Sequence, residues 1–165
     1  MKNLFFITMI VFFAFLSCRG EEDTVQKIDQ VINLYIDSLG QDMLNTKIPG
    51  SYISSSMNDV YGLTDTAPVS FSIKKDADTI SYIEYLAGAK RIGIDSSGSL
   101  KTYESKIALF LTKKINDSTN KISNDTLTIQ YQSTPEIFQV SKIWYNGVLR
   151  FTKVDGQPNT VKIVK

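Results

Sequence analysis

Histidine is absent from this 165-residue chain, and cysteine occurs only once, as Cys18. Without histidine the chain lacks the usual general base near neutral pH and the commonest zinc ligand. One cysteine cannot form an internal disulfide, so packing and hydrogen bonds alone must stabilise the fold. Glycine-rich phosphate-binding patterns and Gly-x-Ser-x-Gly are also missing. We therefore expect a non-enzymatic protein that uses no metal or other cofactor.

Neither sign of charge predominates. The chain has 18 lysines and arginines and 17 aspartates and glutamates, which gives a formal net charge of +1. Proteins whose main partner is nucleic acid or an anionic membrane surface carry a clear basic excess. We therefore expect neither of these to be the main partner.

Long apolar runs are rare, and the clearest one covers residues 4–16. Lys2 precedes this run and the small residue Ser17 follows it, as in a secretory signal peptide. The run is too short for a retained transmembrane helix, which needs about 20 apolar residues to cross the hydrocarbon core. Residues 1–17 are therefore predicted to be a signal peptide.

Cys18 directly follows the predicted signal peptide. The stretch Phe15-Leu16-Ser17-Cys18 resembles a bacterial lipobox, although that pattern usually has Leu in place of Phe15 and Ala or Ser in place of Leu16. The resemblance implies that Cys18 is acylated with chains such as palmitate and anchors the protein to a membrane. Each buried CH₂ contributes about 0.8 kcal/mol, so several acyl chains on one residue make membrane attachment effectively permanent. Simple secretion is the alternative, but Phe15 suits ordinary signal peptidase poorly.

Three acidic residues, Glu21, Glu22 and Asp23, follow Cys18 within a few positions. This cluster resembles the surface-export signal of Bacteroidota lipoproteins. The resemblance implies that residues 18–23 form an acylated cysteine with a short acidic tether, on a lipoprotein of the outer membrane. We expect it on the cell surface, with the periplasmic face of that membrane as the alternative.

Residues 24–45 show a helical pattern. Asp23 suits the N-cap position, and Pro49-Gly50 ends the segment. Apolar side chains recur at steps of three and four, which would place them on one helix face. They are Val25, Ile28, Ile32, Tyr35, Ile36, Leu39 and Met43. We expect this helix to pack on a sheet.

From residue 50 onward the apolar residues alternate with polar ones, as in half-buried strands. Val69, Phe71 and Ile73 form one such set. Asn146-Gly147 lies between two apolar runs and predicts a type I′ hairpin, because both turn residues must accept positive φ. Asp155-Gly156 predicts a further turn before the last strand.

The predicted fold is therefore α+β and mainly β, with a single globular domain over residues 24–165. One N-terminal helix, residues 24–45, packs on an antiparallel meander of about seven or eight strands within residues 50–165. Both a closed barrel and a two-sheet sandwich would satisfy this pattern.

The expected first strand opens with Gly50-Ser51-Tyr52. With the meander that follows, this opening is similar to lipocalin-like domains, which often begin with Gly-x-Trp and include many bacterial lipoproteins. The resemblance implies a barrel. The chain departs from it in having Tyr52 in place of tryptophan, a helix before the strands and no helix after them.

Eight tyrosines and one tryptophan are the most distinctive side chains. Tyrosine has an apolar body and a polar tip, which suits sheet surfaces and binding faces alike. The candidate binding face consists of Tyr82, Tyr85, Tyr103, Tyr131, Trp144 and Tyr145. We expect a non-catalytic module that binds a small ligand or a protein. An accessory subunit of an envelope protein assembly is the alternative.

Catalytic readings have less support. The third alternative is a hydrolase that acts on glycans and uses a pair of carboxylates for catalysis. The candidates for such a pair are Glu84, Glu104 and Glu136. Ser72 and Lys75 match Ser-x-x-Lys but fall on an expected strand, where they would point to opposite faces. Asp76 and Asp78 could begin a calcium site, but the glycine and closing glutamate of such a loop do not follow.

Asp followed by Ser or Thr and then an apolar residue or Thr occurs six times, which exceeds the expectation from composition. This triplet resembles the O-glycosylation acceptor of exported Bacteroidota proteins. The candidate acceptors beside expected loops are Thr66, Thr79, Ser118 and Thr126. The alternative is structural, since Asp-Ser and Asp-Thr are also favoured in turns.

Overall fold

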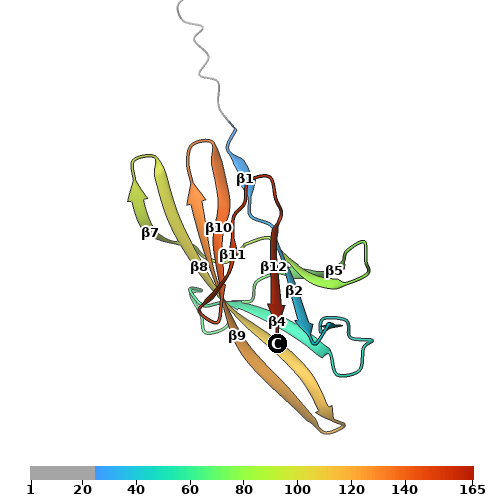
Figure 1. Ribbon diagram of the computed structural model, residues 1–165. Coiled ribbons are helices and arrows are strands. Elements are labelled where there is room, and N and C mark those ends of the chain that lie inside the picture. The colour runs from blue at the N-terminus through green and yellow to red at the C-terminus, as the bar shows by residue number, and fades with distance from the viewer. Residues whose placement is uncertain (1–24) are drawn as a thin grey trace, which may run out of the picture.

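Twelve β-strands in two sheets account for most of the described chain (Figure 1). The structure is a computed structural model and describes residues 25–165. The predicted signal peptide (1–17), Cys18 and the tether (18–23) lie outside the described residues. The mainly-β prediction is confirmed, and the sheets curl into a half-barrel.

The large sheet has seven strands. They are β1 (Lys27–Asp29), β4 (Tyr52–Asp59), β7 (Ile92–Ser97), β8 (Leu100–Asn116), β9 (Thr119–Ser133), β10 (Ile137–Tyr145) and β11 (Val148–Thr152). β7 to β11 are antiparallel to their neighbours in chain order, so this part is the predicted meander. β4 pairs with the second half of β8, and β1 with the first residues of β10.

The small sheet has five strands. They are β2 (Ile32–Ser38), β3 (Gln41–Asp42), β5 (Phe71–Lys75), β6 (Ser81–Tyr85) and β12 (Asn159–Val164). Its order is β12-β2-β6-β5, with β3 beside the end of β2.

The predicted helix over residues 24–45 is wrong, since its described part contains β1, β2 and β3. Within it, Ile32, Leu34 and Ile36 alternate with polar residues and tyrosine, and these three side chains are buried. Pairing with β12 and β6 buries this period-two set, and such tertiary pairing outweighs the weaker helical periodicity.

Most strand pairs are antiparallel as predicted, but β1–β10 and β2–β12 are parallel pairs that the predicted antiparallel meander did not include. The chain passes from the large sheet to the small one three times, and the first and last of these crossings lie between β1 and β2 and between β11 and β12. The N-terminal strands therefore run alongside C-terminal strands in the same direction. Twelve strands replace the expected seven or eight, partly because the expected helix contributes three.

A partly buried ion pair joins the chain at these two crossings. Lys153 Nζ lies 2.5 Å from Asp29 Oδ2 and also donates to Asn159 Oδ1 at 3.0 Å. Asn159 Nδ2 donates to Asp29 Oδ1 at 2.8 Å and to the Val31 carbonyl at 2.9 Å. Burial alone would raise the pKa of Asp29, but the bonds from Lys153 and Asn159 outweigh it and lower that pKa.

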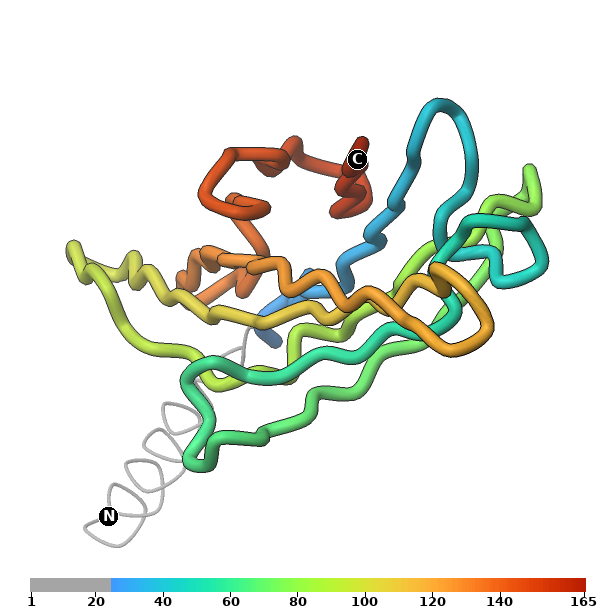
Figure 2. The backbone as a smooth tube through the Cα atoms, turned by 90° about the horizontal axis from the view of Figure 1, so that it is seen from below, coloured from blue at the N-terminus to red at the C-terminus, as the bar shows by residue number. Residues whose placement is uncertain are grey.

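One core lies between the sheets. The large sheet contributes buried rows on β8, β9 and β10, and the small sheet contributes rows on β2, β6 and β12. Figure 2 shows β2 and β12 on one side of the long β8–β9 ribbon. The central residues of these rows include Leu34, Ile83, Leu109, Ile129 and Ile163.

Two tight hairpins have both turn residues at positive φ. Asn146 and Gly147 have φ of 49° and 79° between β10 and β11, which confirms the predicted type I′ turn. Leu39 and Gly40 have φ of 53° and 80° between β2 and β3. Leu39 is fully exposed, and a branched aliphatic side chain is unfavourable in this left-handed conformation.

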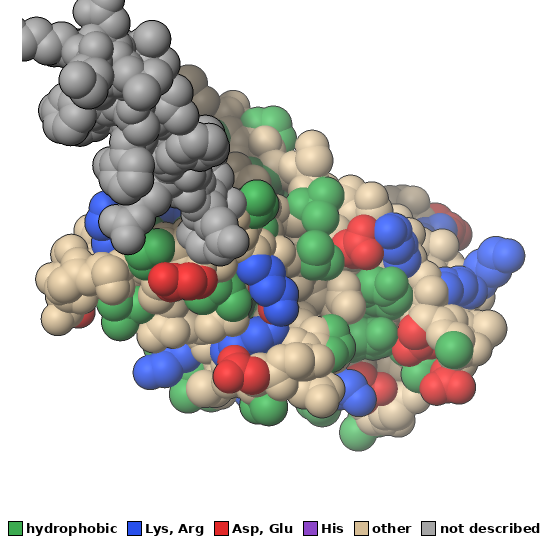
Figure 3. Space-filling model, turned by 90° about the horizontal axis from the view of Figure 1, so that it is seen from above, with side chains coloured by type: hydrophobic (Ala, Val, Ile, Leu, Met, Phe, Trp, Pro, Cys, Tyr) green, Lys and Arg blue, Asp and Glu red, His purple; other side chains and the backbone are tan. Residues whose placement is uncertain are grey.

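Among residues 25–165, no helix is long and apolar enough to cross a membrane. On the face seen from above in Figure 3, lysines and arginines are interspersed with aspartates and glutamates. This face therefore carries no extended region of one charge.

Candidate functional site

A row of four long side chains crosses the outer face of the small sheet. Lys162 of β12 lies beside Tyr35 of β2 in the parallel register, and Lys74 of β5 is the cross-strand partner of Tyr82 of β6. The rings of Tyr35 and Tyr82 are stacked, with centroids 5.2 Å apart and planes at 26°. We call Lys162, Tyr35, Tyr82 and Lys74 the tyrosine row.

Strand alternation places this row outside the core. Leu34 and Ile36 flank Tyr35 in sequence and are buried, so Tyr35 points to the opposite face. Tyr82 lies between the buried Ser81 and Ile83 and follows the same rule. Both tyrosines are half-buried, which leaves part of each ring open to a ligand.

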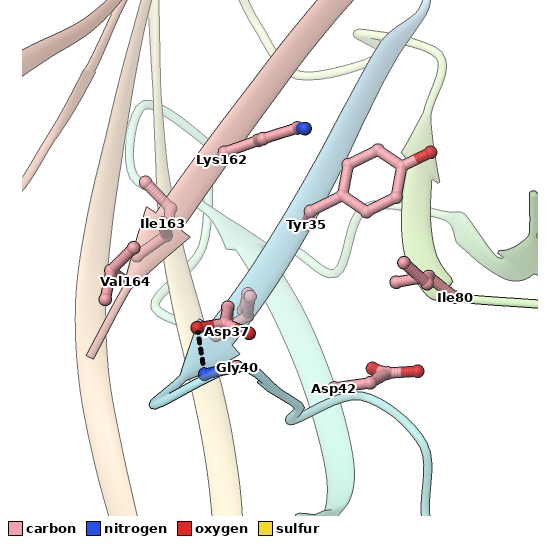
Figure 4. Close-up of a pocket in the computed structure, with 9 residues that line it drawn as sticks. Tyr35, Asp37, Gly40, Asp42, Ile80, Lys162, Ile163 and Val164 are labelled. Carbon is pink, nitrogen blue, oxygen red and sulfur yellow. Dashed lines mark hydrogen bonds between the residues drawn. The ribbon is translucent and has the colours of Figure 1, made fainter. Parts of the chain in front are cut away.

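A pocket of about 310 Å³ adjoins the tyrosine row at Tyr35 (Figure 4). The residues around it include Tyr35, Asp37, Asp42, Ile80, Lys162 and Val164. In Figure 4, Lys162 and Tyr35 project from neighbouring strands onto the same side, and Ile80 lies beyond the Tyr35 ring. Aromatic and aliphatic walls with a few charged groups are typical of small-ligand pockets.

Two aspartates fix the walls of this pocket. Asp42 accepts hydrogen bonds from the N–H groups of Leu44 at 3.0 Å and Ser81 at 2.8 Å, which joins the β3 segment to β6. Asp76 Oδ1 accepts from the N–H group of Ile80 at 2.9 Å in the β5–β6 turn. Walls that are held before a ligand arrives lower the entropic cost of binding.

The Tyr35 hydroxyl lies near the Asp76 carboxylate. Partial burial and this negative charge raise the pKa of Tyr35 above its usual value. The hydroxyl therefore keeps its proton at neutral pH and can act as a hydrogen-bond donor.

Polar residues form a second row beside the first. Asn33 and Ser72 are both cross-strand partners of Glu84, and Glu84 Oε1 lies 2.6 Å from Lys74 Nζ. The Asn33 Oδ1 atom is buried and has no hydrogen-bond partner among the described residues. A buried acceptor without a hydrogen bond lowers the stability of the folded state.

The six aromatic residues predicted to form a binding face do not share one surface. Tyr85, Tyr131 and Tyr145 are buried in the core. Tyr103 packs against that core, and Trp144 is half-buried on the outer side of β10. Of the six, Tyr82 alone belongs to the tyrosine row.

Tyr103 and Tyr131 belong to an aromatic cluster around Arg91. The Arg91 guanidinium lies 5.0 Å from the Tyr131 ring centroid and 4.7 Å from that of Phe138. The Tyr131 and Phe138 rings are stacked at 5.5 Å. Arg91 Nη2 also donates to Gln30 Oε1 and to the Ala87 carbonyl, both at 2.7 Å. The cluster joins the β6–β7 segment to the large sheet.

The candidate O-glycosylation acceptors differ in accessibility. Thr66, Thr79 and Ser118 are exposed and lie outside the strands. Thr126 is half-buried within β9, where its N–H group donates to Asn146 Oδ1 at 2.7 Å.

The three candidate glutamates lie on separate elements with separate partners. Glu84 of β6 pairs with Lys74, Glu104 of β8 accepts from the Tyr61 hydroxyl at 2.7 Å, and Glu136 accepts from Thr134. The Glu104 contact, with burial, raises the pKa of Tyr61 to about 12. Within residues 25–165 no group of three or more acidic residues is arranged to hold a metal ion.

Sequence reasoning missed Tyr35, Lys74 and Lys162. The helical pattern places Tyr35 on the apolar face of the expected helix. The signal that could have found it is the alternation of Ile32, Leu34 and Ile36 around it. The register that brings Lys162 beside Tyr35 depends on a parallel pairing of distant segments, which one sequence does not specify.

Comparisons of this chain with protein-family models, with curated proteins and with solved structures found no match.

Proposed function

We propose that this protein is a lipid-anchored lipoprotein of the outer membrane, exposed on the cell surface, that binds a small ligand without catalysing a reaction. The binding surface is the tyrosine row with its adjoining pocket. The observation that carries the proposal is the stacked Tyr35–Tyr82 pair beside a pocket whose walls are already held in place.

The anchor rests on the sequence. An apolar run, the lipobox-like Phe15–Cys18 stretch and the acidic residues 21–23 occur in the order expected of an exported lipoprotein. Attachment through acyl chains on Cys18 requires no further contact between the folded domain and the membrane.

The binding role rests on the chemistry of the outer face. Stacked rings offer a flat apolar surface, and the Tyr35 hydroxyl and the two lysines of the row offer hydrogen-bond donors. A ligand that suits this face is compact, with an apolar or ring-shaped side and polar groups at its rim.

Native mass spectrometry of the full-length protein, gently extracted from its own membranes, tests the binding role. We expect a small molecule to co-purify with the wild type and with Trp144→Ala, whose half-buried ring lies on the other sheet. Tyr35→Ala should lose that molecule. Its absence from the wild type, or equal retention by Tyr35→Ala, would overturn the proposal.

Metabolic labelling with a palmitate analogue tests the anchor. The wild type should take up the label and Cys18→Ser should not. Protease added to intact cells should degrade the wild-type protein if it lies on the surface. Label that persists in Cys18→Ser would exclude this cysteine as the attachment point.

An accessory subunit of an envelope assembly is the second candidate. The observation that favours it is Leu39, an exposed leucine at a strained hairpin tip next to Gly40, which lines the pocket. Strain at such a position points to a functional constraint. A co-purifying protein that is lost in Leu39→Asn, with no small molecule present, would favour this role.

A further inference from the structure

A second pocket, of about 240 Å³, lies at the end of the core where the β8–β9 ribbon extends past the small sheet. Lys113, Lys121 and Lys165 line it together with Tyr52, Leu111 and Ser123. We call it the lysine pocket. It is separate from the tyrosine row, which lies on the outer face of the small sheet.

Two of these lysines continue the inward-facing rows of the ribbon. On β8 the buried Ile107, Leu109 and Leu111 are followed, two residues on, by Lys113. Lys113 and Lys121 are direct cross-strand partners. Like charges placed directly opposite one another destabilise a sheet, so this pair has a cost that an apolar pair would avoid.

Lys165 closes the pocket from the small sheet. Its N–H group donates to the Asp37 carbonyl at 2.9 Å, and the Ser38 hydroxyl donates to its carbonyl at 2.8 Å. Its Nζ pairs with the buried Asp125 and lies 5.9 Å from the centroid of the Tyr52 ring. The main chain and the ion pair therefore hold this ammonium group in place.

The Asp125 carboxylate already has several hydrogen-bond partners. Besides Lys165, it accepts from Asn146 Nδ2 at 2.8 Å and from Ser123 Oγ at 3.4 Å. Within the described part of the chain, neither Lys113 nor Lys121 forms an ion pair. Three lysines thus line one small pocket, and one carboxylate balances one of them.

We propose that the lysine pocket binds the phosphate group of a small ligand between Lys113 and Lys121. A phosphate accepts charge-assisted hydrogen bonds from lysine, and Lys113 and Lys121 are the two lysines of the pocket that form no ion pair within the described part of the chain. A bound anion converts the repulsion between the two lysines into attraction to a shared partner. The ring of Tyr52 and the side chain of Leu111 form the apolar remainder of the site.

The test is a thermal-shift titration of the full-length protein in neutral detergent with inorganic phosphate, at constant ionic strength. The melting temperature should rise and saturate with phosphate, because a ligand that binds only the folded state stabilises it. Lys113→Gln and Lys121→Gln should each weaken the apparent phosphate affinity by about tenfold. Lys101→Gln, an exposed lysine near the other end of β8, is the matched control and should respond like the wild type.

A second readout needs no ligand. Lys121→Gln removes the like-charge pair, so without phosphate its melting temperature should equal or exceed that of the wild type. A wild type that does not respond to phosphate or to a soluble short-chain phosphatidic acid overturns the proposal, as do pocket variants that respond like Lys101→Gln. A response to phosphate assigns the site to free phosphate compounds. A response to phosphatidic acid alone assigns the phosphate to a lipid headgroup.

Discussion

Single residues in this protein occupy conformations and environments that oppose their intrinsic preferences. Leu39 has a φ of 53° at the tip of the β2–β3 hairpin, although no neighbour holds its side chain there. The left-handed region costs an ordinary residue about 1–2 kcal/mol, and Asn-Gly is the preferred pair for a type I′ turn.

Leu39→Asn should therefore raise the free energy of unfolding by roughly 1 kcal/mol. Urea denaturation monitored by circular dichroism measures this change. Leu63→Asn is the control, because Leu63 is also highly exposed but has no positive φ. Equal effects of the two substitutions would show that lost surface hydrophobicity, and not turn conformation, determines the result.

The contacts of the Arg91 side chain depend on its planar shape as well as on its charge. Its planar guanidinium contacts the Tyr131 and Phe138 rings while it donates two hydrogen bonds. Lysine keeps the charge but cannot reproduce this planar set of contacts.

Arg91→Lys should lower the free energy of unfolding by about 1–2 kcal/mol. The exposed Arg150 provides the control, and Arg150→Lys should change stability by less than about 0.5 kcal/mol. Chemical denaturation of both variants tests this difference. If Arg91→Lys and Arg150→Lys are similarly stable, a lysine in the cluster around Arg91 would be as stabilising as the arginine.

At the scale of elements, the parts with local signals could be predicted and the parts set by distant pairing could not. Asn146-Gly147 determines its own turn, and the β7–β11 meander follows from alternation with short connections. β2 carries both a helical and an alternating pattern, and its parallel pairing with β12 decides between them. The tyrosine row was missed for the same reason, since it needs the register of four strands.

One partly buried ion pair links the two chain segments that change sheets at β1–β2 and β11–β12. The Lys153 side chain is only 7% exposed, so its removal leaves Asp29 charged with fewer partners. Breaking such a pair from one side is far more costly than removing both charges.

Lys153→Met should lower the free energy of unfolding by about 1.5–3 kcal/mol, and the double variant with Asp29→Asn should recover part of this loss. Equilibrium denaturation of the single and double variants measures the coupling. Lys142→Met, at an exposed position of β10, should be nearly neutral. Additive effects of Asp29→Asn and Lys153→Met would contradict an interaction between these two residues.

For the whole molecule, the absence of histidine determines how stability depends on pH. Few side chains titrate between about pH 6 and pH 8 without it. Asp29 and Asp125 both have lowered pKa values, since hydrogen bonds from their partners outweigh the effect of burial. A carboxylate whose folded pKa is lowered contributes stability above its unfolded pKa and loses it as the pH falls through the folded value.

The melting temperature should therefore be nearly constant from about pH 6 to pH 8 and should fall below about pH 4. Thermal unfolding by circular dichroism between these limits provides the test. Asp125→Asn should be less stable at neutral pH and should show a shallower acid limb. A marked loss of stability between pH 7 and pH 6 would point to a titrating group other than these carboxylates.

β1 lies at one end of the molecule, and β2 and β12 both run from there toward the opposite end (Figure 1). The pocket beside Tyr35 and the lysine pocket adjoin the far ends of these two strands. If the protein is anchored through Cys18 as we propose, the described domain is attached at its β1 end, and both openings lie at the end of the domain remote from the attachment. Under that proposal, solutes reach either opening without first passing the lipid surface.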